Sequence, residues 1–236
     1  HVEDKLRTVL WGWAGKPIDD ESLEAVACLQ ELLHGPLGDP LRASITPAEV
    51  AAVLRFASDH AVPVVPRGAG TGLSGGSVPA QGGIALVLAG MRAIKELDTD
   101  SMVAVVEPGV ITGVFQKTVE DAGMFYPPDP ASLNYCTLGG NIAENAGGPH
   151  GVKYGVTKDY VLGLEVVIPS GDVVRLGGKQ IKNVTGYNLV QLFVGSEGTL
   201  GVITEATLRL LPKPPAKKVM LAIFDRLDGA AEAVAG

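Results

Sequence analysis

The feature that most constrains this chain is a run of glycines directly after a short apolar stretch. Residues 63–76 read PVVPRGAGTGLSGG, with glycine at positions 68, 70, 72, 75 and 76. A strand that opens into such a loop allows successive backbone N–H groups to point inward at close range, which holds phosphate without lysine. By composition alone, a glycine-rich surface loop is an equally good interpretation.

The loop fits neither standard nucleotide-binding template. It lacks the Gly-Lys-Ser/Thr ending of a P-loop, and residues 77–83 are turn-like and lead into a strand, whereas a dinucleotide-binding fold requires a helix there. A phosphate site on this loop therefore needs a different architecture.

Composition excludes several classes of function. The 236 residues carry a net charge of −7, which argues against nucleic acid as a partner. Cys28 and Cys136 lie far apart and predict neither a disulfide framework nor a metal site, so we expect a reducing, cytoplasmic environment. The uncharged stretch 68–91 contains too many glycines and polar groups for a membrane span.

Periodicity predicts an α+β chain with mixed sheets. Thr46, with Pro47 after it and Glu49 three residues on, predicts a capped helix that runs to about His60. A hairpin turn is expected at residues 170–172. Further helices are predicted at 22–33, 110–122 and 187–194, a last one from about 228, and strands at 62–66, 84–88, 102–106, 161–169, 172–176, 201–211 and 219–224.

Two later segments are also rich in small residues. Residues 127–155 contain PPDPAS, CTLGGNIAENAGG and KYG, and predict either a flat hydrogen-bonding wall for a planar ligand or simply tight packing. Residues 195–204, GSEGTLGVIT, run from a turn into a strand, and their backbone amides are candidates for the edge of a ring.

Taken in order, these motifs resemble a known family. RGAGTGLSGG, VEPGV, PPDPAS, CTLGGNIAENAGG, KYG, TGYNL and GSEGTLGVIT look like the FAD-binding half of the vanillyl-alcohol-oxidase type flavoproteins. Within that superfamily they are similar to the glycolate oxidase FAD subunit and to the D-lactate and D-2-hydroxyglutarate dehydrogenases. The resemblance implies an α+β fold in which two subdomains, about 46–97 and 99–211, enclose FAD.

The resemblance also assigns positions to the cofactor. The first loop would hold the FAD diphosphate, and because residues 66–76 contain no histidine, it implies noncovalent FAD. The middle segment would line the flavin and ribityl chain, and residues 197–203 would close the site at the adenine and ribose end. The assigned residues are Pro66, Arg67, Gly68, Ala69, Gly70, Thr71, Gly72 and Gly75; Pro128, Asp129, Ser132, Thr137, Gly139, Gly140, Asn141, Asn145, Ala146, Gly147, Tyr154 and Gly155; and Glu197, Gly198, Gly201, Val202 and Ile203.

Several side chains keep two interpretations. Arg67 is either the cation nearest the diphosphate or part of a surface ion pair. His150 is either near the flavin or solvated, with solvation the more common case. Tyr154 either touches a substrate carboxylate or has a structural role. Tyr187 is expected in the core or an interface, and Cys136 as a packing residue.

By resemblance, the expected activity is oxidation of a D-2-hydroxy acid, glycolate or D-lactate, to the 2-oxo acid, with hydride transfer to flavin N5. No catalytic residue is assigned. The alternatives are an FAD-binding fragment or subunit without turnover, and another branch of the superfamily, such as an alcohol oxidase or an ether-lipid synthase. We expect a quinone or partner electron carrier as acceptor, and membrane association only through partner subunits.

The sequence also suggests a division of the chain. Residues 1–45 are expected to be a lead-in of unclear role, 46–214 the FAD-binding domain, and 215–236 the start of a truncated cap domain. The first residue is His1 rather than Met, and new elements are predicted just before Gly236, so the chain is expected to be an excerpt.

Overall fold

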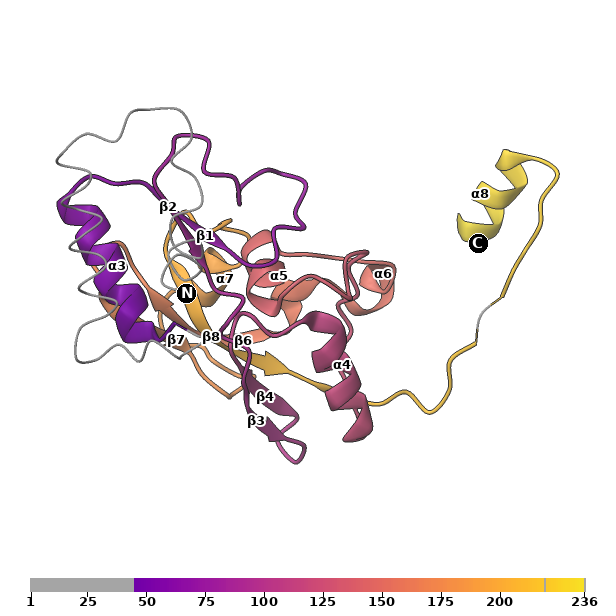
Figure 1. The fold of residues 1–236 in the computed structure, drawn as a ribbon. Helices are drawn as coiled ribbons and strands as arrows, with labels where there is room; N and C mark the ends of the chain where they lie inside the picture. The colour runs from indigo at the N-terminus through magenta and orange to yellow at the C-terminus, as the bar shows by residue number, and fades with distance from the viewer. Residues whose placement is uncertain (1–44, 219, 236) are drawn as a thin grey trace.

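The computed structural model describes residues 45–218 and 220–235 and shows a mixed α+β fold (Figure 1). Short helices and strands alternate, as the sequence predicts. In chain order the elements are α3 (Pro47–Asp59), β1 (Val64–Arg67), β2 (Ile84–Val87), β3 (Ile94–Asp98), β4 (Val103–Val106), α4 (Thr112–Asp121), β5 (Met124–Phe125), α5 (Leu138–Glu144), α6 (Gly151–Tyr154), η1 (Thr157–Asp159), β6 (Val161–Val167), β7 (Val173–Gly177), α7 (Leu189–Phe193), β8 (Val202–Arg209), β9 (Leu211–Pro212) and α8 (Leu227–Ala235).

The first described helix begins as its sequence predicts. The Thr46 side chain accepts a hydrogen bond from the Glu49 backbone N–H at 3.3 Å, and the Thr46 N–H donates to the Glu49 carboxylate at 2.6 Å, which completes a capping box. Both bonds satisfy N–H groups that a helix start leaves without partners. The buried face of α3 is apolar and includes Val50, Val53 and Leu54.

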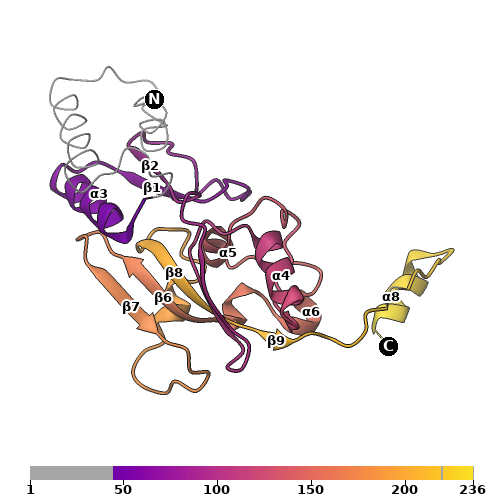
Figure 2. The same ribbon diagram turned by 60° about the horizontal axis from the view of Figure 1, so that its bottom comes forward.

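Two separate sheets carry most of the strands. β1 and β2 pair in parallel, with Val64 opposite Ile84 and Arg67 opposite Val87. A five-stranded antiparallel sheet has the order β3-β4-β8-β6-β7, and Figure 2 shows β7, β6 and β8 side by side. The predicted hairpin at 170–172 joins β6 to β7, with Gly171 in a positive-φ turn at 78°.

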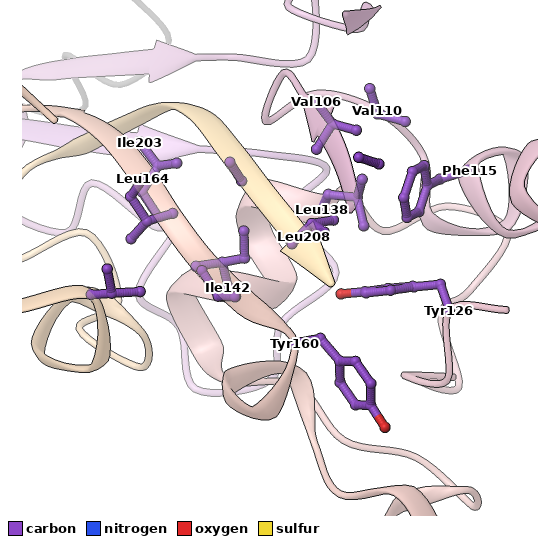
Figure 3. Close-up of a cluster of buried hydrophobic side chains, with 14 of the residues drawn as sticks. Val106, Val110, Phe115, Tyr126, Leu138, Ile142, Tyr160, Leu164, Ile203 and Leu208 are labelled. Carbon is purple, nitrogen blue, oxygen red and sulfur yellow. The ribbon is translucent and has the colours of Figure 1, made fainter. Parts of the chain in front are cut away.

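The described core consists of two hydrophobic clusters that meet at the five-stranded sheet. One lies between the sheet and α4, α5 and α7, and in Figure 3 Ile142 of α5 and Leu208 of β8 belong to it. The other joins α3 and β2 to the same sheet through Val167 and Val202. A register shift between Glu165 and Val166 accompanies this change of side, so the ends of β6 and β8 are buried on both faces.

Two sequence predictions need correction, and one strand was missed. Residues 220–224 form no strand: their apolar side chains are exposed, and they pair with no described strand, without which an extended segment is unstable. Strand β3 was not predicted, because IKELD alternates only weakly. Tyr187 is 94% exposed and is therefore not a core residue. The helix predicted from about residue 228 is confirmed as α8.

Some predictions stay open. The helix predicted at 22–33 lies outside the described residues. The domain boundaries at 45, 97–99 and 214 remain predictions, although β1 and β2 form a sheet of their own. Within residues 45–218 and 220–235, no helix has both the length and the apolar character needed to cross a membrane.

Replacing the cap residue tests the start of α3. We expect Thr46→Ala to lower the free energy of unfolding by about 1 kcal/mol, because it removes the side-chain acceptor of the capping box. Urea denaturation measures the change. Thr118→Ala is the matched control, since that exposed hydroxyl only bonds back to the Val114 carbonyl inside α4. An equal loss in both variants would contradict a specific role for the cap.

Candidate functional site

A cleft lies where three distant segments of the chain meet. It holds about 1000 Å³ of empty space, open solvent at its mouth included. Arg67 and Leu88, at the carboxyl ends of the parallel strands β1 and β2, line it together with residues from α5 and from the loop before β8. Ligands of α/β proteins typically bind outside the carboxyl ends of parallel strands.

The glycine loop that follows β1 forms the first wall. Among the described residues, no backbone N–H from Gly68 to Ser77 donates to an acceptor of the protein. Ten consecutive residues thus keep their N–H donors available for solvent or a ligand. Backbone N–H groups inside proteins are almost always paired, so a run of unused donors is unusual. Arg67 stabilises this loop from inside, because its guanidinium donates to the Ser77 carbonyl at 3.2 Å.

Helix α5 forms the second wall and has little donor capacity left. Thr137 caps it by accepting from the Gly140 N–H at 3.3 Å, and the N–H groups of Leu138 and Gly139 donate to the carbonyls of Val110 and Pro108. A Cβ built on Gly68 would collide with the Thr137 hydroxyl, so the glycine loop rests directly on this cap. Only glycine permits such an approach.

The loop before β8 forms the third wall. Glu197 has a positive φ of 51°, which is uncommon for a residue other than glycine. Its N–H donates to the Ala143 carbonyl at 2.8 Å, and its carboxylate accepts from the Ser74 hydroxyl at 3.0 Å. This one residue therefore contacts both other walls, α5 and the glycine loop.

The charge of the cleft is mixed. Glu144, at the end of α5, lies against Gly72 of the glycine loop and lines the cleft together with Glu197 and Arg67. Partial burial of its carboxylate, and then repulsion by Glu197, raise the pKa of Glu144, although the residue keeps some exposure to solvent. No ion pair with a described residue compensates either glutamate.

Most of the residues that the sequence assigned to a cofactor line this cleft. They come from all three walls, so the structure brings the three motifs together. They are Pro66, Arg67, Gly68, Ala69, Gly70, Thr71, Gly72, Ser132, Thr137, Gly139, Gly140, Asn141, Ala146, Glu197, Gly198, Gly201 and Ile203. The guanidinium of Arg67 lies within the loop and forms no ion pair with a described residue, and its contact with a diphosphate stays a prediction.

Other assigned residues do not line the cleft. Asn145 ends α5 in a left-handed conformation, and its side chain accepts from the Lys158 N–H at 2.9 Å. Val202 is buried in the cluster of α3, and Gly75 faces open space. The remaining residues in this group are Pro128, Asp129, Gly147, Tyr154 and Gly155, and their contact with a cofactor stays a prediction.

Asp129 and His150 form a separate contact beside the cleft. The Asp129 carboxylate accepts from the His150 backbone N–H at 3.0 Å and lies 3.1 Å from its Nδ1 atom. The ring of His150 packs edge-on against Phe125 and Tyr154. Asp129 thus holds the neighbouring loop, and the backbone carbonyl of Tyr154 accepts from the Tyr160 hydroxyl at 2.6 Å. Both alternatives for the Tyr154 side chain stay predictions.

The sequence analysis missed several lining residues. Glu144 and Ala143 stand inside a recognised motif, but nothing local shows that they face the loop. Leu88 could have been found from the parallel pairing of β1 with β2, which places both carboxyl ends at one edge. Cys136 is buried as predicted and also reaches the cleft. The other missed residues are Ser77, Pro108, Pro130 and Ser196, whereas Gly76 belongs to the loop that the sequence assigned to the diphosphate.

The raised pKa of Glu144 gives the chain a pH-dependent stability. A carboxyl group whose pKa is raised by folding favours the folded state fully below its ordinary pKa of 4.5, and that contribution is lost as pH rises through the folded-state value. We expect Glu144→Gln to flatten this part of the curve of melting temperature against pH. Glu232→Gln, an exposed change on α8, should leave the curve unchanged, and equal effects of both variants would refute the prediction.

Comparison with known proteins identifies the family of this architecture. A family model described as "FAD binding domain" matches residues 44–177. The chain is 53% identical over 186 residues to glycolate oxidase subunit GlcD of Bacillus subtilis, a match that covers 79% of this chain and 40% of that protein. It is 42% identical to a D-lactate dehydrogenase of Anaerostipes hadrus, over 76% of this chain and 38% of that protein.

Solved structures agree with the fold. An alkyldihydroxyacetonephosphate synthase superposes with a TM-score of 0.62 at 28% identity, over 72% of this chain and 33% of that one. A 6-hydroxy-D-nicotine oxidase of Arthrobacter nicotinovorans superposes with a TM-score of 0.61 at 22% identity, over 86% of this chain and 43% of that one. The chain spans about two fifths of the curated relatives quoted above. Because the family model matches more than half of its residues, the chain belongs to the FAD-binding domain family, and FAD is its cofactor.

Proposed function

We propose that this chain is the FAD-binding part of an enzyme that oxidises a D-2-hydroxy acid to the 2-oxo acid. Glycolate and D-lactate are the first substrates to test, because relatives with 53% and 42% identity bear the names of a glycolate oxidase subunit and a D-lactate dehydrogenase. The observation that carries the proposal is the glycine loop. Its backbone N–H donors remain unused, and the loop lines the cleft of a domain that belongs to an FAD-binding family.

The residues of the cleft fit FAD. The unused N–H groups from Gly68 to Ser77 match the oxygens of a diphosphate, and Arg67 places a cation at the start of the same loop. The glycines permit close approach of a ligand to the backbone. Because residues 66–76 contain no histidine, we propose that the cofactor is held without a covalent bond.

Bound FAD supplies a hydride acceptor for the α-carbon of the substrate. The chain's own contribution is to bind and orient: the glycine loop holds the diphosphate, and the α5 wall with Thr137 and Ser132 lines the remainder of the cleft. We assign no residue as the base that takes the hydroxyl proton. We propose a quinone or a partner electron carrier as the final electron acceptor, and the word "subunit" in the name of one relative supports partner chains.

Two alternatives deserve a test. The chain could bind FAD without turnover of its own, since it spans about two fifths of those relatives. It could also belong to an enzyme of another branch of the superfamily, because the superposed structures include an alkyldihydroxyacetonephosphate synthase. Anaerobic addition of substrates to the FAD-loaded chain tests the first alternative, and a substrate panel on the full-length protein tests the second.

The first experiment follows the flavin colour. We expect the purified chain to bind FAD and to release it to the supernatant on acid precipitation, because the bond is noncovalent. Glycolate or D-lactate should then bleach the bound flavin, whereas L-lactate should not. Colour that stays in the pellet would contradict noncovalent binding, and bound flavin that neither acid reduces would favour the alternatives.

Gly68→Ala tests the contact between the glycine loop and α5. The added methyl group would collide with the Thr137 hydroxyl, so the loop must move away from the cap, and we expect FAD affinity to fall at least about tenfold. Gly151→Ala is the control, because its nearest neighbour outside the local chain is 3.9 Å away. Titration of FAD fluorescence measures both variants, and equal affinities would contradict the proposed diphosphate site.

A further inference from the structure

Few hydrogen bonds hold the glycine loop in place. In the part of the chain that the structure describes, none of the loop's own N–H groups forms a backbone hydrogen bond, and the only one that a loop carbonyl accepts is from the Val78 N–H to Gly75 at 3.0 Å. Among the described residues, two side-chain hydrogen bonds hold it. Arg67 donates to the Ser77 carbonyl at 3.2 Å near the base, and Ser74 donates to the Glu197 carboxylate at 3.0 Å near the tip.

The bond at the tip is the one that fixes the loop relative to another wall. Arg67 ends β1 and Ser77 closes the loop that follows it, so their bond ties the loop back to its own strand and not to another wall. Ser74 and Glu197, in contrast, are 123 positions apart in the sequence. The Glu197 carboxylate also lies against Gly76, where a Cβ would stand 2.7 Å from its oxygen, so a side chain there would displace it.

Glu197 itself is anchored to the core. Its N–H donates to the Ala143 carbonyl at 2.8 Å, and the N–H of Gly195 donates to the Ile142 carbonyl at 2.9 Å. Ile142 is fully buried on α5. The positive φ of Glu197 costs energy in a residue with a Cβ and persists only where its surroundings fix it.

We propose that Glu197 is the positioning residue of the glycine loop: its anchored carboxylate holds the loop through Ser74 so that the free N–H groups face the FAD diphosphate. This inference rests on the proposed placement of the diphosphate. Glu197 needs to contribute an acceptor oxygen and not a charge, since a carboxylate repels a diphosphate. A glutamine at this position keeps an acceptor and removes the repulsion.

The test is a double-mutant cycle on FAD affinity, measured with the full chain by quenching of flavin fluorescence. We expect Ser74→Ala and Glu197→Ala each to weaken FAD binding about threefold to tenfold, the range for loss of one hydrogen bond. The double variant should be no weaker than the weaker single variant, because both changes remove the same bond. Glu197→Gln should bind FAD at least as tightly as the wild type.

Ser170→Ala is the matched control. Ser170 donates to the Asp172 carboxylate at 2.6 Å in an exposed hairpin outside the cleft, so its removal should leave FAD affinity unchanged. Additive losses in the double variant, or a Glu197→Gln variant as weak as Glu197→Ala, would overturn the inference. If Glu197→Ala does not fold, wild-type affinity in Ser74→Ala overturns it alone. Failure of the wild type to bind FAD would instead overturn the placement of the cofactor.

Discussion

The contact of Gly68 with the Thr137 cap is the constraint on which the cleft depends. Thr137 holds the first turn of α5, and α5 is fixed to the sheet by Leu138 and Ile142, which are completely buried. A loop with few bonds of its own thereby rests on a helix that is fixed in the described core. Because Gly68 has no Cβ, its backbone lies directly against Thr137, and the position of the core thereby fixes the position of the glycine loop.

Hydrogen-bond donors are divided between the two glycine-rich segments. In α5, the N–H groups of residues 138–141 are all spent on the protein, on Val110, Pro108 and Thr137. In the loop after β1 they are all available. The two glycine-rich segments therefore have different roles: α5 forms a wall of the cleft, and the loop after β1 offers its N–H groups to a ligand.

The sequence predicted those parts of the fold that local signals determine. The capping box of Thr46, the Val- and Ile-rich strands and the turn at Gly171 depend on residues close together in the chain, and the structure confirms them. Helix α5 was not predicted, since LGGNIAE carries two glycines that each cost a helix about 1 kcal/mol. Burial of its apolar face against the sheet outweighs that cost.

The site was predictable in its motifs but not in its side-chain directions. Asn145 and Asp129 stand in the right segments, yet they bond to Lys158 and His150 beside the cleft. Glu144 faces the glycine loop only because α5 packs there, a relation between residues 72 positions apart that no local pattern contains. Such directions follow from tertiary packing.

The burial of both faces at the end of β6 has a consequence for folding. Val166 contributes to one hydrophobic cluster and its neighbour Val167 to the other, so adjacent residues of a single strand belong to two cores. Neither core can lose its packing without exposing the strand that the other one needs. The two halves that enclose the cleft are thereby linked into one cooperative unit, and opening of the cleft by local unfolding of either half carries the cost of disturbing both.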